Sequence, residues 1–304
     1  MAQRPRPPLA ARVAGLEPFL AMEVMERAFE MEAAGADVVH LEIGEPEPDP
    51  PPEAIEACVQ ALRGRETGYT DSRGLLELRE AIAADCARRC GVSPDPGRIL
   101  VTSGTSPAML LAFSLLVGPG DEVILPAPVY PCYPNFVRYC GGVPVLVPTF
   151  AEDGFAIDPD RIAAAITDRT RAIVVNSPAN PTGAVQSAGT LAALARLGLP
   201  LLSDEIYDGL LYDGAHVTSG LTLDADAFVF DGFSKRYAMT GFRLGWLVAP
   251  EWAARPLQTM QQNLFISASR FVQRAGIAAL LHGEAHVARI RERYAARRDR
   301  LVSG

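Results

Sequence analysis

From Arg98 onward, the sequence alternates short apolar runs with longer helical or loop segments. The runs are Ile99–Thr102, Glu122–Leu125, Val143–Val147, Ala172–Asn176, Leu199–Ser203, Phe228–Phe230 and Leu244–Val248. Most of their residues are β-branched or leucine, and continuous apolar runs of this length are typical of strands buried on both faces. The alternation therefore predicts an α/β fold with a mainly parallel sheet that helices cover on both sides.

Helical spacing and stop signals predict further elements outside this region. Before it, we expect an extended arm (1–15), a helix over Pro18–Ala34, a short strand over Val38–Ile43, and helices over Glu53–Arg63 and Gly74–Cys90. After it, we expect helices over Glu251–Asn263, Ser267–His282 and Glu284–Leu301.

Composition excludes several classes of protein. The 49 % hydrophobic content fits a globular chain with a substantial core, and no apolar stretch has the length of a bilayer span. The N-terminus has no apolar core of the kind found in a secretory signal. The five cysteines contain no CxxC pair, which favours reduced thiols in the cytoplasm and indicates no metal site. A net charge of −8 argues against a general nucleic-acid binder.

Lys235 is the only lysine among the 28 basic residues other than histidine. Arginine can replace lysine wherever a surface needs positive charge, but a guanidinium does not provide a neutral amine. GC-rich codon usage could also have removed the other lysines by chance. Because Lys235 follows the run Phe228–Phe230, it lies where an α/β sheet binds ligands, beyond the carboxyl end of a strand.

Other polar features follow other predicted strands. Ser103–Ser106 opens a helix, where free N–H groups favour an anion, although an ordinary helix cap has the same composition. Asn180 lies in NSPANPTG, which a turn would also explain. Asp204 and Tyr207 follow the run Leu199–Ser203, and an acid at the end of an apolar strand is costly unless it meets a cation.

One small molecule, pyridoxal 5'-phosphate, accounts for all of these features. It needs a lysine for a Schiff base, a helix start and an arginine for its phosphate, a carboxylate for its ring nitrogen and donors for its ring oxygen. Arg243 follows Lys235 between two glycines and supplies the arginine.

With these motifs, the chain resembles the class I/II aminotransferases, in the aspartate-aminotransferase superfamily of fold type I pyridoxal-phosphate enzymes. The blocks that carry the resemblance are IGEPEPDPP, GYTDSRGLLELREAIA, VTSGTSPAML, NSPANPTG, SDEIY and FSKRYAMTGFRLGW. The resemblance covers about Arg12 to the C-terminus and implies a transamination between an L-amino acid and a 2-oxo acid by a ping-pong mechanism.

The resemblance also implies roles for individual residues. Lys235 would form the internal Schiff base and move the proton, Asp204 would keep the ring nitrogen protonated, and Tyr207 with Asn180 would bind the ring oxygen. The expected phosphate ligands are Ser103, Gly104, Thr105, Ser234 and Arg243, with Tyr69 reaching the phosphate of a partner subunit. Tyr130, in LPAPVYPCYP, would stack on the ring, and Gly44 would lie beside the substrate carboxylate, with Asn180 also near the substrate.

The implied architecture is a homodimer with shared active sites and two domains in each subunit. We expect residues 1–45 to form an arm and part of a small domain, residues 46–283 the large cofactor-binding domain, and residues 284–304 the start of a C-terminal small domain. The family normally continues for several tens of residues beyond this point, so we expect this small domain to be incomplete.

Two further departures from the family pattern bear on ligands. Gly232 stands where many members have a hydroxyl residue, which removes one expected phosphate contact. QQNLFISAS contains no arginine where dicarboxylate-specific members place one, which favours neutral or hydrophobic amino donors. Two other functions stay open: a β-lyase, decarboxylase or synthase with the same cofactor, and a cofactor-binding module without turnover.

Overall fold

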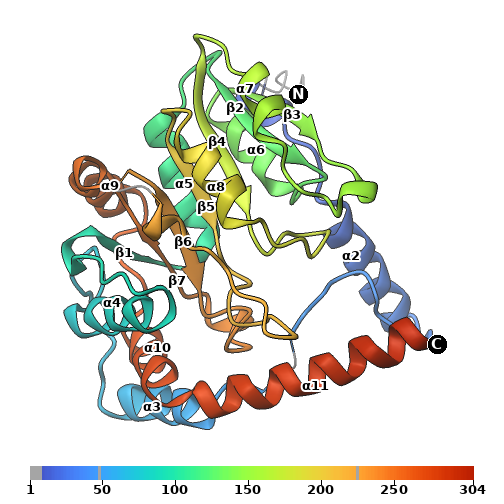
Figure 1. Ribbon diagram of the computed structural model, residues 1–304. Helices are drawn as coiled ribbons and strands as arrows, with labels where there is room; N and C mark the ends of the chain where they lie inside the picture. Colours follow the sequence, from blue (N-terminus) through green and yellow to red (C-terminus); the bar gives the residue numbers. More distant parts are fainter. Residues whose placement is uncertain (1–8, 47–48, 224–225) are drawn as a thin grey trace, which may run out of the picture.

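The computed structural model describes residues 9–46, 49–223 and 226–304 (Figure 1). Its centre is a seven-stranded sheet with strand order β1-β7-β6-β5-β4-β2-β3. The strands are β1 (Ile99–Thr102), β2 (Glu122–Ala127), β3 (Val143–Pro148), β4 (Thr170–Asn176), β5 (Leu201–Asp204), β6 (Phe228–Gly232) and β7 (Gly245–Val248). Each apolar run from Arg98 onward forms one of these strands, so the predicted α/β fold is confirmed.

The sheet is mainly parallel, with one reversed strand. β3, β2, β4, β5 and β6 pair in parallel, whereas β7 is antiparallel to both β6 and β1. Parallel neighbours need a crossover connection, usually an α-helix, but the connection from β6 to β7 contains only turns and one 3₁₀ helix (Thr240–Phe242). The chain therefore returns alongside β6 in the opposite direction.

Helices cover both faces of this sheet. The α-helices are α1 (Ala11–Ala14), α2 (Leu20–Ala33), α3 (Pro52–Arg63), α4 (Leu76–Cys90), α5 (Thr105–Leu116), α6 (Cys132–Tyr139), α7 (Pro159–Ala164), α8 (Ala188–Ala195), α9 (Glu251–Leu264), α10 (Arg270–His282) and α11 (Glu284–Ser303). Short 3₁₀ helices span Pro96–Arg98, Ala151–Asp153, Gly220–Thr222 and Thr240–Phe242.

The alternation of side chains along each strand divides the core into two layers. Leu100 of β1 packs in the cluster that contains α5, α6 and α9. Ile99 and Val101 of the same strand point to the opposite face and pack with α3, α4 and α10. Near the other edge of the sheet, α7 and α8 cover Ile124 and Ile173, whose strand neighbours belong to the α5 layer. Burial on both faces explains why the strands are continuous apolar runs.

The N-terminal segments differ from two of the expectations. Ala11–Ala14 forms a turn of helix within the predicted extended arm, whose residues 1–8 lie outside the described part of the chain. Val38–Ile43 is not a strand, so that prediction was wrong. Val39 is 80 % and Leu41 is 89 % exposed, and a strand needs a neighbour to pair its backbone groups, which no described strand provides.

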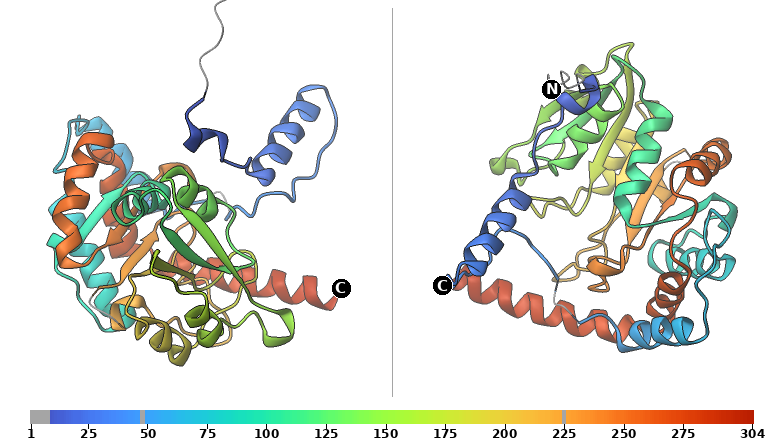
Figure 2. Two further views of the ribbon diagram at one scale, coloured as in Figure 1. Left: turned by 90° about the horizontal axis from the view of Figure 1, so that it is seen from above. Right: turned by 180° about the vertical axis from the view of Figure 1, so that it is seen from behind.

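The two long helices near the ends of the chain, α2 and α11, project outward from the sheet and its covering helices (Figure 2). α2 projects away from the sheet, and only Ala28 of its described residues is buried. α11 has 20 residues and buries Val287 and Ile290 near its start. In the ranges described, no helix is both long enough and apolar enough to span a membrane.

Candidate active site

The carboxyl ends of β4, β5 and β6 bring the predicted segments to one edge of the sheet. The β4–β5 register pairs Asn176 with Asp204, and the β5–β6 register pairs Asp204 with Phe230. Lys235 follows β6 closely in the chain. Features that are far apart in the sequence therefore lie together, at the edge where α/β sheets bind ligands.

Asp204 is the buried acid of this edge. Its carboxylate accepts hydrogen bonds from the Tyr133 hydroxyl and from the backbone N–H of Ile206, the latter at 3.1 Å. Only 5 % of Asp204 is exposed. Burial raises the pKa of this carboxyl to about 6, because the ionised form loses its solvation. Two neutral donors do not replace a counter-charge, so the carboxylate is suited to meet a cation.

Asn180 and Tyr207 form a pair of polar groups beside this acid. The Asn180 side-chain amide donates to the Tyr207 hydroxyl at 3.3 Å. The side chain of Asn176 holds both segments, since its oxygen accepts from the Asn180 N–H at 2.6 Å and its amide donates to the Asp204 carbonyl at 3.0 Å. Burial raises the pKa of Tyr207, so its hydroxyl keeps its proton at neutral pH.

The amine of Lys235 lies between the sheet edge and the N-terminal segment. Its Nζ is 3.5 Å from the Gly44 carbonyl oxygen and 5.9 Å from the centre of the Tyr207 ring. Burial lowers the pKa of Lys235, while nearby Glu45 acts in the opposite direction. The Thr240 hydroxyl donates to Glu45 at 2.5 Å and joins the two segments. An amine with a lowered pKa is more readily neutral, as a nucleophile or base must be.

Arg243 and the start of α5 form a cationic corner. A Cβ on Gly104, whose φ is +93°, would lie 2.6 Å from Nη2 of Arg243, so the guanidinium rests directly on this glycine. The Thr240 carbonyl accepts from Nη1 of Arg243 at 2.8 Å. Ser103 is exposed beside this corner, and Thr105 begins the helix. Free N–H groups at a helix start next to a guanidinium are suited to bind a phosphate.

The remaining predicted residues differ in position. Tyr130 is half-buried, with its ring edge-on to Tyr133 at 5.3 Å and to Phe19 at 5.8 Å. Ser234 is half-buried and precedes the lysine. Tyr69 takes no part in the contacts above, and its side chain is 80 % exposed.

Gly232, where the sequence lacks an expected hydroxyl, ends β6 against β7. A Cβ at this position would lie 3.1 Å from the Gly245 Cα and 3.1 Å from the Leu244 carbonyl oxygen. Close approach of the antiparallel neighbour leaves little room for a larger residue here, which gives a packing reason for the glycine.

The comparison with known proteins decides the family. Residues 36–304 match the family model described as aminotransferase class I and II. The chain belongs to this family.

Relatives and solved structures agree with this aminotransferase assignment. The chain is 41 % identical over 303 residues to a probable aspartate/prephenate aminotransferase of Thermus aquaticus, covering 97 % of this chain and 79 % of the relative. An aspartate aminotransferase from Thermus thermophilus, solved with maleate, has a TM-score of 0.94 at 39 % identity, covering 98 % of this chain and 80 % of that one. An aminotransferase from Mycobacterium tuberculosis has a TM-score of 0.90 at 36 % identity, covering 97 % and 77 %. The predicted family, fold class and enzyme class are confirmed.

Sequence reasoning missed three polar residues that organise this aminotransferase site. Tyr133 donates to Asp204, Asn176 joins the β4 and β5 loops, and Glu45 anchors the lysine-bearing loop. Tyr133 had a usable signal, because it repeats the tyrosine–proline pair of Tyr130 three residues later. The contact of Glu45 with Thr240 joins residues 195 positions apart and leaves no local pattern.

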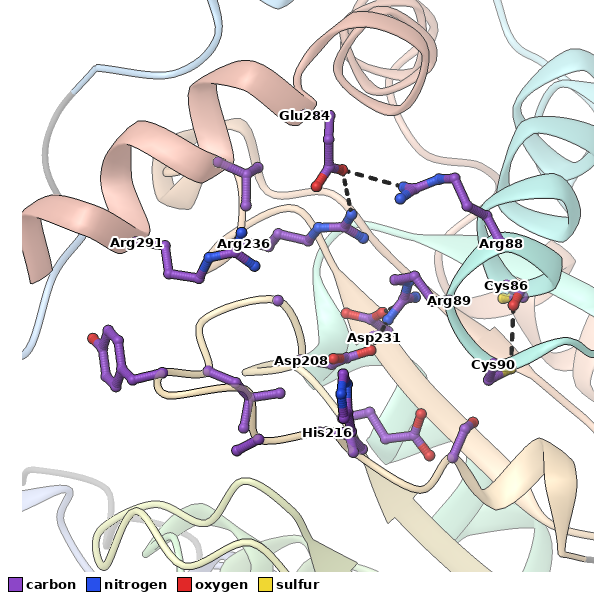
Figure 3. A pocket seen from close by; sticks show the side chains of 18 of the residues that line it. Cys86, Arg88, Arg89, Cys90, Asp208, His216, Asp231, Arg236, Glu284 and Arg291 are labelled. Atoms are coloured by element: carbon purple, nitrogen blue, oxygen red, sulfur yellow. Dashed lines mark hydrogen bonds and ion pairs between the residues drawn. The ribbon is translucent and has the colours of Figure 1, made fainter. Parts of the chain in front are cut away.

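A network of ion pairs lies against the segments that carry Tyr207 and Lys235 in this aminotransferase (Figure 3). Arg89 of α4 pairs with Asp85, Asp208 and Asp231. Arg236, next to Lys235, pairs with Asp85 and with Glu284 of α11, each at 3.0 Å. Apart from Asp85, these side chains line a cavity of about 520 Å³ between α4, the loop after β5 and α11. Most of the charges already pair with one another, so the network fixes α4 and α11 to the loops that carry Tyr207 and Lys235.

Proposed function

We propose that this aminotransferase uses pyridoxal 5'-phosphate, held by Lys235, to move an amino group between an L-amino acid and a 2-oxo acid. The observation that carries the proposal is the convergence on one sheet edge of the only lysine, the buried acid Asp204 and the corner of Arg243 with Gly104. The Asn180–Tyr207 pair completes the set.

The residues present fit the chemical groups of this cofactor. A buried carboxylate with only neutral donors suits the protonated ring nitrogen. The exposed guanidinium of Arg243, with Ser103, Gly104, Thr105 and Ser234, suits the phosphate. The ring face suits the aromatic side chain of Tyr130.

When bound, the ring accepts the electron pair that the substrate α-carbon releases as it loses its proton. The side chains then have separate tasks. The neutral amine of Lys235 would take the proton from the substrate α-carbon and return it to the C4′ carbon of the cofactor, which requires the lowered pKa given by burial. Asp204 keeps the ring nitrogen protonated, while Tyr207 and Asn180 bind the ring oxygen. Gly44 would lie beside the substrate carboxylate, and Asn180 would lie near the substrate.

The same proposal includes the assembly of the enzyme. We infer a cytoplasmic homodimer with shared sites, in which Tyr69 reaches the partner's phosphate; the five free cysteines and the exposed ring of Tyr69 support it. Residues 1–45 would belong to an arm and the small domain, 46–283 to the large domain, and 284–304 to the start of the second part of the small domain.

The identity of the amino donor is the most specific part of this proposal. Relatives named for aspartate and prephenate make acidic donors candidates. The absence of arginine from QQNLFISAS favours neutral or hydrophobic donors instead. We propose a ping-pong transamination. Its donor can be identified by adding single amino acids to the cofactor-loaded enzyme and recording the absorbance of the bound cofactor.

The central test is borohydride reduction of the loaded protein followed by peptide mapping. We expect the cofactor on one peptide, which contains Lys235, and no adduct in Lys235→Arg. An adduct that persists in Lys235→Arg would overturn the proposal, because no other lysine is available. Release of pyruvate with ammonia or a thiol, without any oxo-acid acceptor, would show a lyase instead of a transaminase.

A further inference from the structure

The hydroxyl of Tyr133 contacts the acid on which the proposed function depends. Tyr133 lies near the start of α6, and 1 % of it is exposed. Its hydroxyl donates to Oδ2 of Asp204, while the backbone N–H of Ile206 donates to Oδ1. Each carboxylate oxygen therefore has one donor, and this fixes the plane of the carboxylate.

Tyr133 differs from the other polar groups around Asp204 because its side chain contacts the carboxylate. The phenols of Tyr207 and Tyr130 lie nearby, from the β5 loop and the segment before α6. The side chain of Asn176, from β4, contacts the backbone carbonyl of Asp204 and not its carboxylate. In the described ranges, Tyr133 is the only side chain that donates a hydrogen bond to this carboxylate.

We propose that Tyr133 is a positioning residue for Asp204, whose hydroxyl keeps the carboxylate ionised and oriented toward the ring nitrogen of the cofactor. This inference rests on the proposed function, since it assigns Tyr133 a role only through Asp204. A hydrogen bond to a charged acceptor in a buried place is among the stronger ones, so the loss of one hydroxyl is measurable.

The position of the ring separates packing from hydrogen bonding. The Tyr133 ring contacts Tyr130 edge-on at 5.3 Å, which supports the aromatic residue proposed to stack on the cofactor. Tyr133→Phe keeps this contact and removes only the hydroxyl. A change in this variant therefore reports on the contact with Asp204.

The direction of the effect with pH follows from burial. Burial raises the pKa of Asp204 to about 6, and the Tyr133 hydroxyl opposes that rise because it stabilises the ionised form. Burial also raises the pKa of Tyr133 itself, so the hydroxyl stays a donor through neutral pH. Without the hydroxyl, the pKa of Asp204 rises further, and the carboxylate is neutralised at a higher pH than in the wild type.

The experiment measures the Kd of pyridoxal 5'-phosphate between about pH 5.5 and 8.5 for wild type, Tyr133→Phe and Tyr139→Phe. Tyr139 ends the same helix, is 39 % exposed and makes no contact with Asp204, so it is the matched control. For Tyr133→Phe we expect a Kd about tenfold to a hundredfold higher at pH 7. We also expect its loss of affinity on acidification to begin at a higher pH, with unchanged behaviour in the control.

Two results would overturn the inference. One is a Kd and a pH profile for Tyr133→Phe equal to those of the wild type. The other is a weakening of the same size at every pH, because a loss of packing does not depend on the ionisation of Asp204. Failure of the wild type to bind the cofactor, or an adduct away from Lys235, would instead contradict the proposed function.

A double-mutant cycle separates a role of Tyr133 through Asp204 from a general effect of Tyr133→Phe on folding. In an Asp204→Asn background, no ionised carboxylate needs the hydroxyl, so adding Tyr133→Phe should leave the Kd unchanged. A further large loss of affinity in the double variant would show that Tyr133 does not act through Asp204 and would overturn the inference.

Discussion

The carboxyl of Asp204 is held where water cannot solvate it, with hydrogen bonds from one hydroxyl and one backbone N–H. The residue type was predictable, since an acid that ends an apolar strand implies a cationic partner. The repeated tyrosine–proline pair marks Tyr133 in the sequence, but its contact with Asp204 was not predictable, because a tyrosine on a short helix is ordinary core until its neighbours in space are known. At this scale the sequence indicates the residues proposed to react, but not the side chains that contact and support them.

We expect Asp204→Asn to stabilise the cofactor-free protein above pH 6. The folded state raises the pKa of Asp204 from 3.8 to about 6, so the wild type loses stability as the pH rises from about 4 to about 6. Asparagine does not titrate, and each pKa unit is worth about 1.4 kcal/mol, so the gain at pH 8 reaches up to about 3 kcal/mol. Urea unfolding at pH 4 and pH 8 measures it.

The exposed acid Asp153 provides the control for that measurement. Asp153→Asn should change the free energy of unfolding by less than about 0.5 kcal/mol at either pH. If Asp204→Asn gained no stability at pH 8, or gained as much at pH 4, the argument from burial would be wrong.

Secondary structure elements show where local patterns suffice. β1 begins and ends where its apolar run does, because a strand buried on both faces has almost no polar positions. Val38–Ile43 is also rich in β-branched and leucine residues, yet it is not a strand, because strand formation also depends on a neighbour that the local sequence does not specify. The apolar pattern likewise did not predict the reversed direction of β7, since this direction depends on a connection that contains no α-helix.

At this scale we expect Gly104→Ala to weaken phosphate binding at the junction of α5 and Arg243. The new Cβ would meet Nη2 of Arg243 at 2.6 Å and displace the guanidinium from the helix start. We expect the Kd of pyridoxal 5'-phosphate to rise about tenfold or more, and the Kd of pyridoxal, which lacks the phosphate, to change much less. Titration with both ligands gives the comparison.

Gly120→Ala is the control for backbone strain. Gly120 also has a positive φ, of +81°, but an added Cβ would meet nothing within 4 Å. This variant should lose stability without a selective loss of the phosphate ligand. Equal losses for pyridoxal and its phosphate in Gly104→Ala would show that the displaced guanidinium does not bind the phosphate.

For the whole molecule, the resemblance to a family predicts more than the pattern of apolar and polar residues does. The pattern predicts the sheet and its two helical layers, because burial is visible in composition. The pattern of apolar residues does not predict the directions in which α2 and α11 project, since few of their residues are buried. The proposed dimer is implied by the family resemblance. It can be tested at Tyr69, whose side chain is exposed.

If Tyr69 reaches the partner's phosphate, two defective variants should repair each other. Lys235→Arg lacks the reacting amine, and Tyr69→Phe lacks a phosphate contact. In a mixed dimer, the site with an intact Lys235 receives an intact Tyr69 from its partner. Random pairing of equal amounts should give wild-type affinity at about a quarter of all sites, since half of the dimers are mixed and each has one intact site.

The readout is the fraction of sites that borohydride fixes at a cofactor concentration between the Kd values of wild type and Tyr69→Phe. Mixing Lys235→Arg with the double variant Lys235→Arg/Tyr69→Phe is the control and should give no fixed sites. If Tyr69 served its own subunit, the mixture of single variants would regain nothing, because every site with the lysine would still lack the tyrosine. Fixation of about a quarter of all sites therefore requires that the protein is a dimer and that Tyr69 of each subunit contacts the phosphate bound by the other subunit.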